Sequence, residues 1–408
     1  MMKIFNRFIL MIFLMFNCSN PLDAQWQQTN GLYSETIQCF AVNGQNIFAG
    51  TFANGVYLSI DNGASWTAVN SGLTNTNILA LVVNGANIFA GSAQGVFRST
   101  NNGTSWTAVN TGLTNIYVNA LAVLNTNLFA STGQGVFLST NNGSNWIAVN
   151  AGLTNNYTQT FAVSETSIFV GTGNAVMDKK SVFRSTNNGT NWINVSTGEV
   201  DCNALAFADT NLLASAGYGG VYRSTNNGSN WTKLDNILTN SFIKTFAVSG
   251  FKYFAGGANV YLSINGGENW TDVSAGLPAG VVNVLAVCGD NLFAGYRFYG
   301  VWKRPLSEMV TVVEKLPHDL AIQFNLKQNY PNPFNPLTTI TFSLPSKCFS
   351  SLSIYDVVGR KVTTLISEEM SAGNYSFQWN ATNYSAGLYY YRLQAGHFTD
   401  TKKLLLVK

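Results

Sequence analysis

The segment Ser139–Trp146, with the sequence STNNGSNW, decides the fold because its pattern occurs six times in the chain. Every copy has Ser first, Gly fifth and Trp last. The other copies are Ser59–Trp66 (SIDNGASW), Ser99–Trp106 (STNNGTSW), Ser185–Trp192 (STNNGTNW), Ser224–Trp231 (STNNGSNW) and Ser263–Trp270 (SINGGENW). Successive tryptophans are 40, 40, 46, 39 and 39 residues apart, and this period indicates repeated supersecondary units that stack on one another.

Each repeat contains four short segments in a constant order. In the second repeat, Ile78–Val83 (ILALVV) is continuously apolar, which is typical of a strand buried on both faces. The segments Ile88–Ser92, Gly95–Thr100 and Trp106–Asn110 follow, separated by turns rich in Gly and Asn. Four such strands form one antiparallel blade. No segment has helical periodicity, so the repeats predict an all-β propeller whose closed ring protects the strand edges.

The blade count follows from the central run of each repeat, which has the form LAV…NLFAG. It occurs seven times, at residues 40–50, 80–91, 121–131, 161–171, 205–215, 246–256 and 285–295. The seventh copy ends near Trp302 without a final strand, whereas Trp26–Leu32 resembles the final strand of a repeat. We therefore expect a seven-bladed propeller over residues 25–304, with the N-terminal strand completing the last blade.

The N-terminus has the features of a secretory signal peptide. Lys3 and Arg7 precede the apolar run Phe8–Phe16, which is too short to span a bilayer. A small residue, Ala24, stands where a signal peptidase would cut, so we expect residues 1–24 to be removed and no transmembrane anchor to remain. Lipid attachment at Cys18 is an open alternative.

Charge and cysteine content narrow the classes of partner. Residues 25–304 contain 11 Lys and Arg and 11 Asp and Glu, so the large domain is formally neutral and carries no basic stripe for nucleic acid. The cysteines remaining after position 24 are scattered and form no disulfide framework. They are Cys39, Cys202, Cys288 and Cys348.

The repeated pattern resembles the Asp-box of sialidases, sortilin-type receptors, xyloglucanases and photosystem II assembly factors. The third residue is Asp only at Asp61, and an Asn oxygen can close the same turn by accepting backbone N–H bonds. The corresponding asparagines are Asn101, Asn141, Asn187, Asn226 and Asn265. We expect the indoles to pack between neighbouring sheets and to find backbone partners; they are Trp66, Trp106, Trp146, Trp192, Trp231 and Trp270. The box is therefore interpreted as a folding device.

No catalytic, metal-binding or cofactor-binding set is recognised in the sequence. Both histidines, His318 and His397, lie outside the propeller, which excludes a histidine-based triad or zinc site within it. Three arginines occupy the same slot in different repeats and cannot converge on one carboxylate, as a sialidase requires; they are Arg98, Arg184 and Arg223. Eleven carboxylates leave a glycosidase acid pair open as an alternative.

Departures from the repeat mark the expected ligand face, at the loops near the channel mouth. The fourth repeat has an insertion, Gly173–Lys180, and the seventh has an aromatic run beside an arginine. Exposed aromatic rings beside Arg stack on sugars or anchor proteins, although these rings can equally pack on one another. The candidate ligand-binding residues are Tyr296, Arg297, Phe298, Tyr299, Tyr218, Asp178, Lys179 and Lys180, with Phe52, Tyr117 and Tyr157 in loops of the same face.

Residues 305–324 read as a linker, and residues 325–408 contain short alternating strands that predict a small β-sandwich. This segment closely resembles the type A sorting domain of the type IX secretion system of Bacteroidota. The matching residues are Asn329, Tyr330, Pro331, Asn332, Pro333, Phe334, Asp356, Gly359, Arg360, Gly387, Lys402 and Lys403. The resemblance implies periplasmic entry, contact with the secretion machinery, outer-membrane translocation, and then loss of the tail or attachment to surface lipopolysaccharide.

The favoured hypothesis is therefore a non-enzymatic, secreted or surface-tethered propeller that binds a glycan or a protein. A secreted glycoside hydrolase and an assembly or stability factor are the alternatives. A pair of acids about 5–10 Å apart at the channel would favour the hydrolase, and an aromatic patch without them would favour binding.

Overall fold

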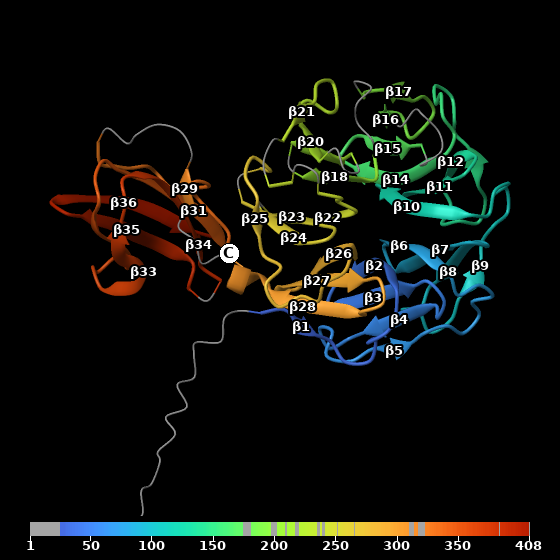
Figure 1. Ribbon diagram of the computed structural model, residues 1–408, viewed down its shortest axis with the longest axis horizontal. Helices are drawn as coiled ribbons and strands as arrows, with labels where there is room; N and C mark the ends of the chain where they lie inside the picture. The colour runs from blue at the N-terminus through green and yellow to red at the C-terminus, as the bar shows by residue number, and fades with distance from the viewer. Residues whose placement is uncertain are drawn as a thin grey trace, which may run out of the picture. The chain divides into compact units, whose positions relative to one another are not determined.

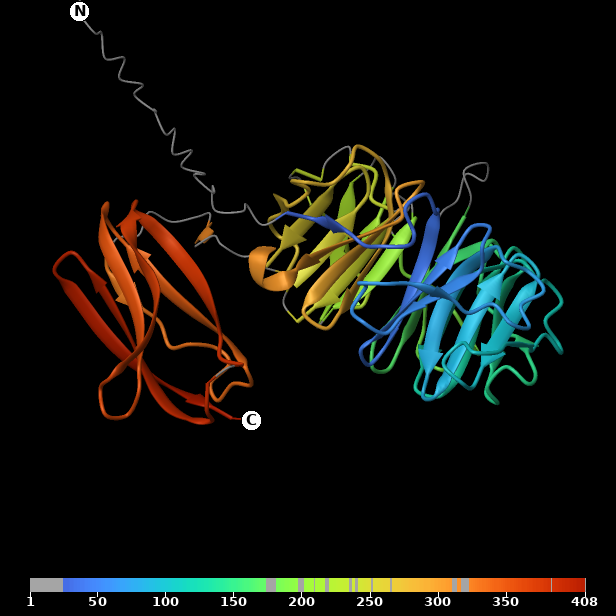
Figure 2. The same cartoon turned by 90° about the horizontal axis from the view of Figure 1, so that it is seen from below.

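The computed structural model describes residues 25–173, 181–196, 202–208, 210–216, 220–234, 237–238, 241–250, 252–264, 266–309, 314–316, 323–382 and 384–407. The expected signal peptide lies outside these residues. The chain forms two compact units, Met1–Met309 and Val310–Lys408. The first contains seven four-stranded antiparallel sheets arranged in a ring (Figures 1 and 2).

The first six sheets each use four strands that are consecutive in the chain. Blade 1 consists of β2 (Ile37–Asn43), β3 (Asn46–Thr51), β4 (Val56–Ser59) and β5 (Thr67–Ala68). Blade 2 consists of β6 (Ile78–Asn84), β7 (Asn87–Ser92), β8 (Gly95–Ser99) and β9 (Thr107–Ala108). Blade 3 consists of β10 (Val118–Leu124), β11 (Asn127–Thr132), β12 (Gly135–Ser139) and β13 (Ile147–Ala148). Blade 4 consists of β14 (Thr158–Val163), β15 (Ile168–Thr172), β16 (Ser181–Ser185) and β17 (Ile193–Asn194). Blade 5 consists of β18 (Ala204–Ala208), β19 (Asn211–Ser215), β20 (Val221–Ser224) and β21 (Thr232–Lys233). Blade 6 consists of β22 (Thr245–Ser249), β23 (Lys252–Gly256), β24 (Val260–Ser263) and β25 (Thr271–Asp272).

The seventh sheet joins the two ends of the repeat region. It consists of β26 (Val282–Cys288), β27 (Asn291–Tyr296), β28 (Val301–Pro305) and the N-terminal strand β1 (Gln27–Gln28). Gln27 pairs with Lys303 and Gln28 with Trp302, and Figure 1 shows the blue β1 beside the orange β28. The first strand of each blade contacts the first strand of the next, including β26 with β2. The prediction of seven blades closed by the N-terminal strand is confirmed.

Each Asp-box is a turn held by its own side chains. In all six copies the Ser Oγ accepts a hydrogen bond from the backbone N–H of the fifth residue at 2.8–2.9 Å. Asp61 Oδ1 accepts from the backbone N–H of Ser65, and Asn101 Oδ1 accepts from that of Ser105, both at 2.9 Å. An Asn oxygen therefore replaces the Asp oxygen in the same bond, while Asn265 of the sixth box lies outside the described residues.

The boxes also connect neighbouring blades. Four indole Nε1 atoms donate to a carbonyl of the preceding blade at 2.7–2.8 Å; the pairs are Trp106 with Val69, Trp146 with Val109, Trp192 with Val149 and Trp231 with Val195. Trp66 instead donates to the Thr29 hydroxyl at 3.0 Å. Trp270 donates to Gly267 O in its own box at 2.9 Å. Most boxes thus stabilise the ring as well as their own turn.

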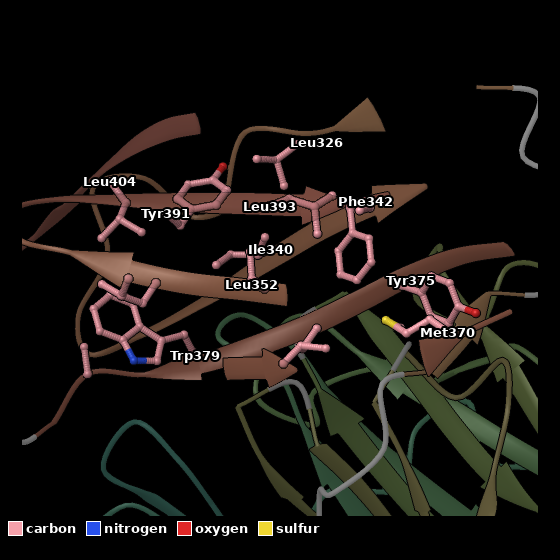
Figure 3. Close-up of a cluster of buried hydrophobic side chains, with 14 of the residues drawn as sticks. Leu326, Ile340, Phe342, Leu352, Met370, Tyr375, Trp379, Tyr391, Leu393 and Leu404 are labelled. Carbon is pink, nitrogen blue, oxygen red and sulfur yellow. The ribbon is translucent and has the colours of Figure 1, made fainter. Parts of the chain in front are cut away.

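The second unit is a pair of four-stranded sheets. One has the order β29 (Glu314–Leu316), β34 (Gly373–Asn380), β31 (Leu337–Leu344), β30 (Asn325–Leu326); the other has the order β33 (Lys361–Met370), β32 (Cys348–Tyr355), β35 (Gly387–Ala395), β36 (Phe398–Leu406). Side chains of both sheets, including Ile340, Trp379 and Leu393, form one buried core (Figure 3). The expected linker at 305–324 is partly structured, since it contains the 3-10 turn η2 (Leu306–Met309) and β29.

The sorting-domain residues have structural roles within this unit. Asn329 is buried, and its Nδ2 donates to Thr338 Oγ1 at 2.7 Å and to Pro331 O at 3.1 Å. Phe334 is buried in the core, whereas Tyr330 is 82% exposed. Asp356, Gly359 and Arg360 form a turn, in which Asp356 Oδ1 accepts hydrogen bonds from the backbone N–H of Val358 and of Arg360 and Gly359 has φ +81°. Gly387 begins β35, and Lys402 and Lys403 lie in β36.

Candidate ligand-binding site

The inner strands carry β-bulges near one end. In β2, Ile37 pairs with Thr51 and Cys39 with Gly50, so that Gln38 has no partner in the register. The first strands of four other blades shift in the same way, at Leu79, Asn119, Gln159 and Asn283. Because a bulge redirects the side chain of its extra residue, four of these five blades present an amide at equivalent positions.

A pocket of about 280 Å³ lies at these bulges where the last blades meet the first. Its lining residues come from blades 6, 7 and 1 and from the loop ahead of β2; they are Thr36, Gln38, Phe52, Lys244, Asn283, Arg297 and Phe298. Residues from both ends of the ring meet here, so the site is assembled where β26 of the last blade contacts β2 of the first.

Two cations face this pocket. Lys244 Nζ donates to Asn283 Oδ1 at 2.7 Å, and Asn283 Nδ2 donates to Ile37 O at 3.1 Å, which fixes the amide and the ammonium together. Burial lowers the pKa of Lys244, and the nearby Arg297 guanidinium lowers this pKa further. Within the described residues, neither cation has a carboxylate within ion-pair distance.

Two exposed aromatic rings border the same pocket. Phe52 is 54% exposed and Phe298 is 61% exposed. The Arg297 Cζ atom lies 5.1 Å from the centroid of the Phe298 ring, a cation–π arrangement. Phe298 has φ +78°, which is unfavourable for a bulky residue and is found preferentially at functional sites. The β27–β28 loop thus holds an aromatic side chain outward despite a local conformational cost.

The structure separates the sequence-predicted residues. Arg297 and Phe298 line the pocket, whereas Tyr296 is 1% exposed and packs edge-on against Tyr299 with ring centroids 6.0 Å apart. The expectation that Tyr296 offers an exposed ring is wrong, because Tyr296 ends the inner strand β27, which is buried on both faces. Tyr299 is 42% exposed but is not a lining residue. The other candidates, Tyr218, Asp178, Lys179 and Lys180, lie outside the described residues.

The polar lining residues are not among those predicted from the sequence. Gln38 and Asn283 each occupy the second position of an inner strand, between apolar neighbours, and Lys244 directly precedes β22. A polar residue there interrupts an otherwise apolar run, and this interruption was the available signal. Thr36, which precedes β2, has no comparable signal.

A second pocket, of about 560 Å³, lies between the β14–β15 turn and the box of blade 5. Its lining residues are Val163, Ser164, Glu165, Thr166, Phe207, Thr210, Thr225 and Asn227. Glu165 is the one acid in this set, so the lining provides no carboxylate pair.

Among the described residues, no group of three or more His, Cys, Asp or Glu side chains is placed to hold a metal ion. Cys39, Cys202, Cys288 and Cys348 are free thiols. No helix among the described residues is long and apolar enough to cross a membrane.

Comparison with protein families identifies both parts of the chain. Residues 19–220 match the DUF6242 β-propeller domain, and residues 328–408 match the secretion system C-terminal sorting domain. A search of curated proteins finds no significant match.

Solved structures share the fold at low sequence identity. YCF48 bound to a D1 peptide is 13% identical with a TM-score of 0.56, and the match covers 69% of this chain and 96% of YCF48. The GH74 xyloglucanase of Xanthomonas campestris is 14% identical with a TM-score of 0.57, covering 78% and 59%. PorZ, a surface component of the type IX secretion system of Porphyromonas gingivalis, is 14% identical with a TM-score of 0.51, covering 90% and 59%.

These likenesses support the fold, while the family matches identify the parts. The repeat region therefore forms a β-propeller, and the C-terminal unit matches the sorting domain of the type IX secretion system, which indicates secretion or a place on the outer cell surface.

Proposed function

We propose that the propeller is a non-enzymatic binding module that holds a glycan in the pocket bordered by Phe52 and Phe298. One observation carries this proposal: the pocket combines exposed aromatic rings with fixed polar groups, and its lining contains no carboxylate. Sugar rings stack on aromatic faces while their hydroxyls hydrogen-bond to amides such as Gln38. A hydrolase of the usual kind needs two acids beside the scissile bond, and this lining supplies none.

Glu35 is a carboxylate next in the chain to the lining residue Thr36. Its two oxygens accept bonds from Asn54 Nδ2 at 2.9 and 3.0 Å, and its backbone carbonyl accepts from Gly300 N at 3.2 Å. Glu35 therefore supports the loops beside the pocket. A lone carboxylate held in this way favours a structural role over acid–base chemistry.

A protein ligand is the second candidate function. It is favoured by the shared fold of YCF48, which was solved bound to a D1 peptide, and by the exposed rings of Tyr33 and Tyr117 at 54% and 47%. An assembly role at the cell surface, as the description of PorZ suggests for that protein, is a form of this candidate.

A glycan-array screen of the purified protein, with mass-spectrometric analysis of the probes, tests the proposal. Phe298→Ala and Phe52→Ala should each weaken retention of bound glycans about tenfold. We take the stacking of a sugar on one aromatic ring to contribute as much as that of a nucleobase, on the order of 1–3 kcal/mol. Phe349→Ala is the matched control, since this ring is 58% exposed in the other unit. Cleaved probes would establish a hydrolase instead. Retention of no glycan would refute the proposal and favour a protein ligand.

A further inference from the structure

We propose that the site selects a sugar unit that carries a negative charge, with the anionic group bound between Lys244 and Arg297. This inference rests on the proposed glycan-binding function and deepens it. The sugar ring would lie against the aromatic border formed by Phe52 and Phe298.

Unused hydrogen-bond donors carry the argument. The Lys244 ammonium has three donors, and Asn283 Oδ1 accepts from it in the one hydrogen bond that it makes with described residues. The Arg297 guanidinium has five donors, and in the described part of the chain it contacts the Phe298 ring without donating a hydrogen bond. A carboxylate or sulfate accepts several such bonds at once, and charge-assisted bonds are the stronger kind.

The two cations also lie near one another, and no carboxylate among the described residues forms an ion pair with either of them. Their mutual repulsion and the burial of Lys244 both disfavour the charged ammonium, as the lowered pKa of Lys244 indicates. A bound anion would relieve both costs. Elsewhere the propeller does neutralise such a cation, since Arg223 Nη2 lies 3.5 Å from Glu268 Oε1.

Neutral amides and hydroxyls complete the lining. Gln38 and Thr36 can bond to sugar hydroxyls, and no acid among the lining residues would repel an anion. At about 280 Å³ the pocket is slightly smaller than the usual range for small-molecule sites, roughly 300–1,000 Å³. It therefore suits one sugar unit of a longer chain.

The contribution of charge can be isolated with three probes of similar shape. These are trigalacturonate, its fully methyl-esterified form, and a sulfated galacto-oligosaccharide. We expect the methyl ester to bind at least about tenfold more weakly than an acidic form, since a hydrogen bond to a charged group contributes about 1.5–3 kcal/mol. The better of the two acidic probes identifies the anion as carboxylate or sulfate.

Variants of the intact protein locate the effect. Lys244→Met and Arg297→Gln should each reduce binding of the acidic probe about tenfold and leave binding of the methyl ester within about twofold. Arg98→Gln, which removes an arginine on β8 that donates to Asn142 O, should leave both unchanged and serves as the matched control. Arg297 is exposed, so its replacement should not impair folding.

The outcomes separate this inference from the function on which it rests. Equal binding of the acidic probe and its methyl ester, or equal loss of both in Arg297→Gln, would overturn the charge selectivity while leaving glycan binding intact. If neither these probes nor any glycan on the array binds, the proposed function itself fails.

Discussion

The N-terminal closure of the ring makes a measurable prediction for Trp26→Ala. The Trp26 side chain is 3% exposed, and its Nε1 donates to Val273 O at 2.8 Å. Truncating a buried Trp to Ala costs about 3–5 kcal/mol. Val273 O keeps a second donor, Arg304 Nη1 at 3.1 Å, so the lost indole bond adds little. We expect the free energy of unfolding of the propeller to fall by about 4 kcal/mol.

Urea denaturation followed by tryptophan fluorescence measures this change, since eight of the nine tryptophans precede residue 305. With a slope of about 3 kcal/mol/M, the midpoint should fall by about 1 M or more. Trp302→Ala is the matched control, because it removes a half-buried indole from the adjacent strand β28 and should cost about 1–2 kcal/mol. A Trp26→Ala midpoint equal to that of Trp302→Ala would refute the stabilising role of closure.

Three further predictions concern the boxes, a turn and the second unit. Hydrogen bonds from Ser65 and Ser59 lower the pKa of Asp61 to about 2, so the stabilisation by this carboxylate should disappear as the pH falls from about 4 to about 2. The melting temperature of Asp61→Asn should therefore vary less over pH 2–6 than that of the parent protein. Parallel curves of melting temperature against pH would contradict this prediction. Gly72→Ala should destabilise the propeller by about 2–3 kcal/mol, because φ is +86° and a Cβ would lie 2.2 Å from Trp106 O; an unchanged urea midpoint would argue against the steric reasoning. Tyr391→Phe should lower the thermal stability of the C-terminal unit by about 1–3 kcal/mol in calorimetry, because its buried hydroxyl bonds two backbone groups at 2.7 and 2.8 Å; a loss below about 0.5 kcal/mol would show that these groups find other partners.

The repeat made the propeller predictable because the Ser and Gly of each box close the same turn, while most of the Trp indoles bond to the preceding blade. Asn62 and Gly63 both have positive φ, and a Cβ on Gly63 would lie 2.5 Å from Phe293 Cε1 of the neighbouring blade. Such constraints recur with the period and are visible in one chain.

The candidate site could be predicted only in part, because tertiary structure and not a local pattern brings its residues together. Phe298 stands out as a departure from the repeat, but Lys244 and Asn283 come from adjacent blades, and Gln38 and Phe52 of the first blade join them only because the ring closes. Tyr296 was wrongly expected to be exposed, since a run of aromatic residues in the sequence does not indicate which side chains are buried. Distances around a closed ring are set by tertiary structure, and no local pattern reports them.

Closure by β1 has a consequence for how the protein reaches its destination. Gln27 pairs with Lys303, which lies 276 positions further along the chain, so the N-terminal strand can find its place only after the last blade has formed. Contacts between such distant segments are slow to form. A chain that leaves the cytoplasm N-terminus first would therefore remain an open ring until β28 has also crossed the first membrane. Until then the last blade lacks its fourth strand, and its unpaired edge is open to pairing with other chains.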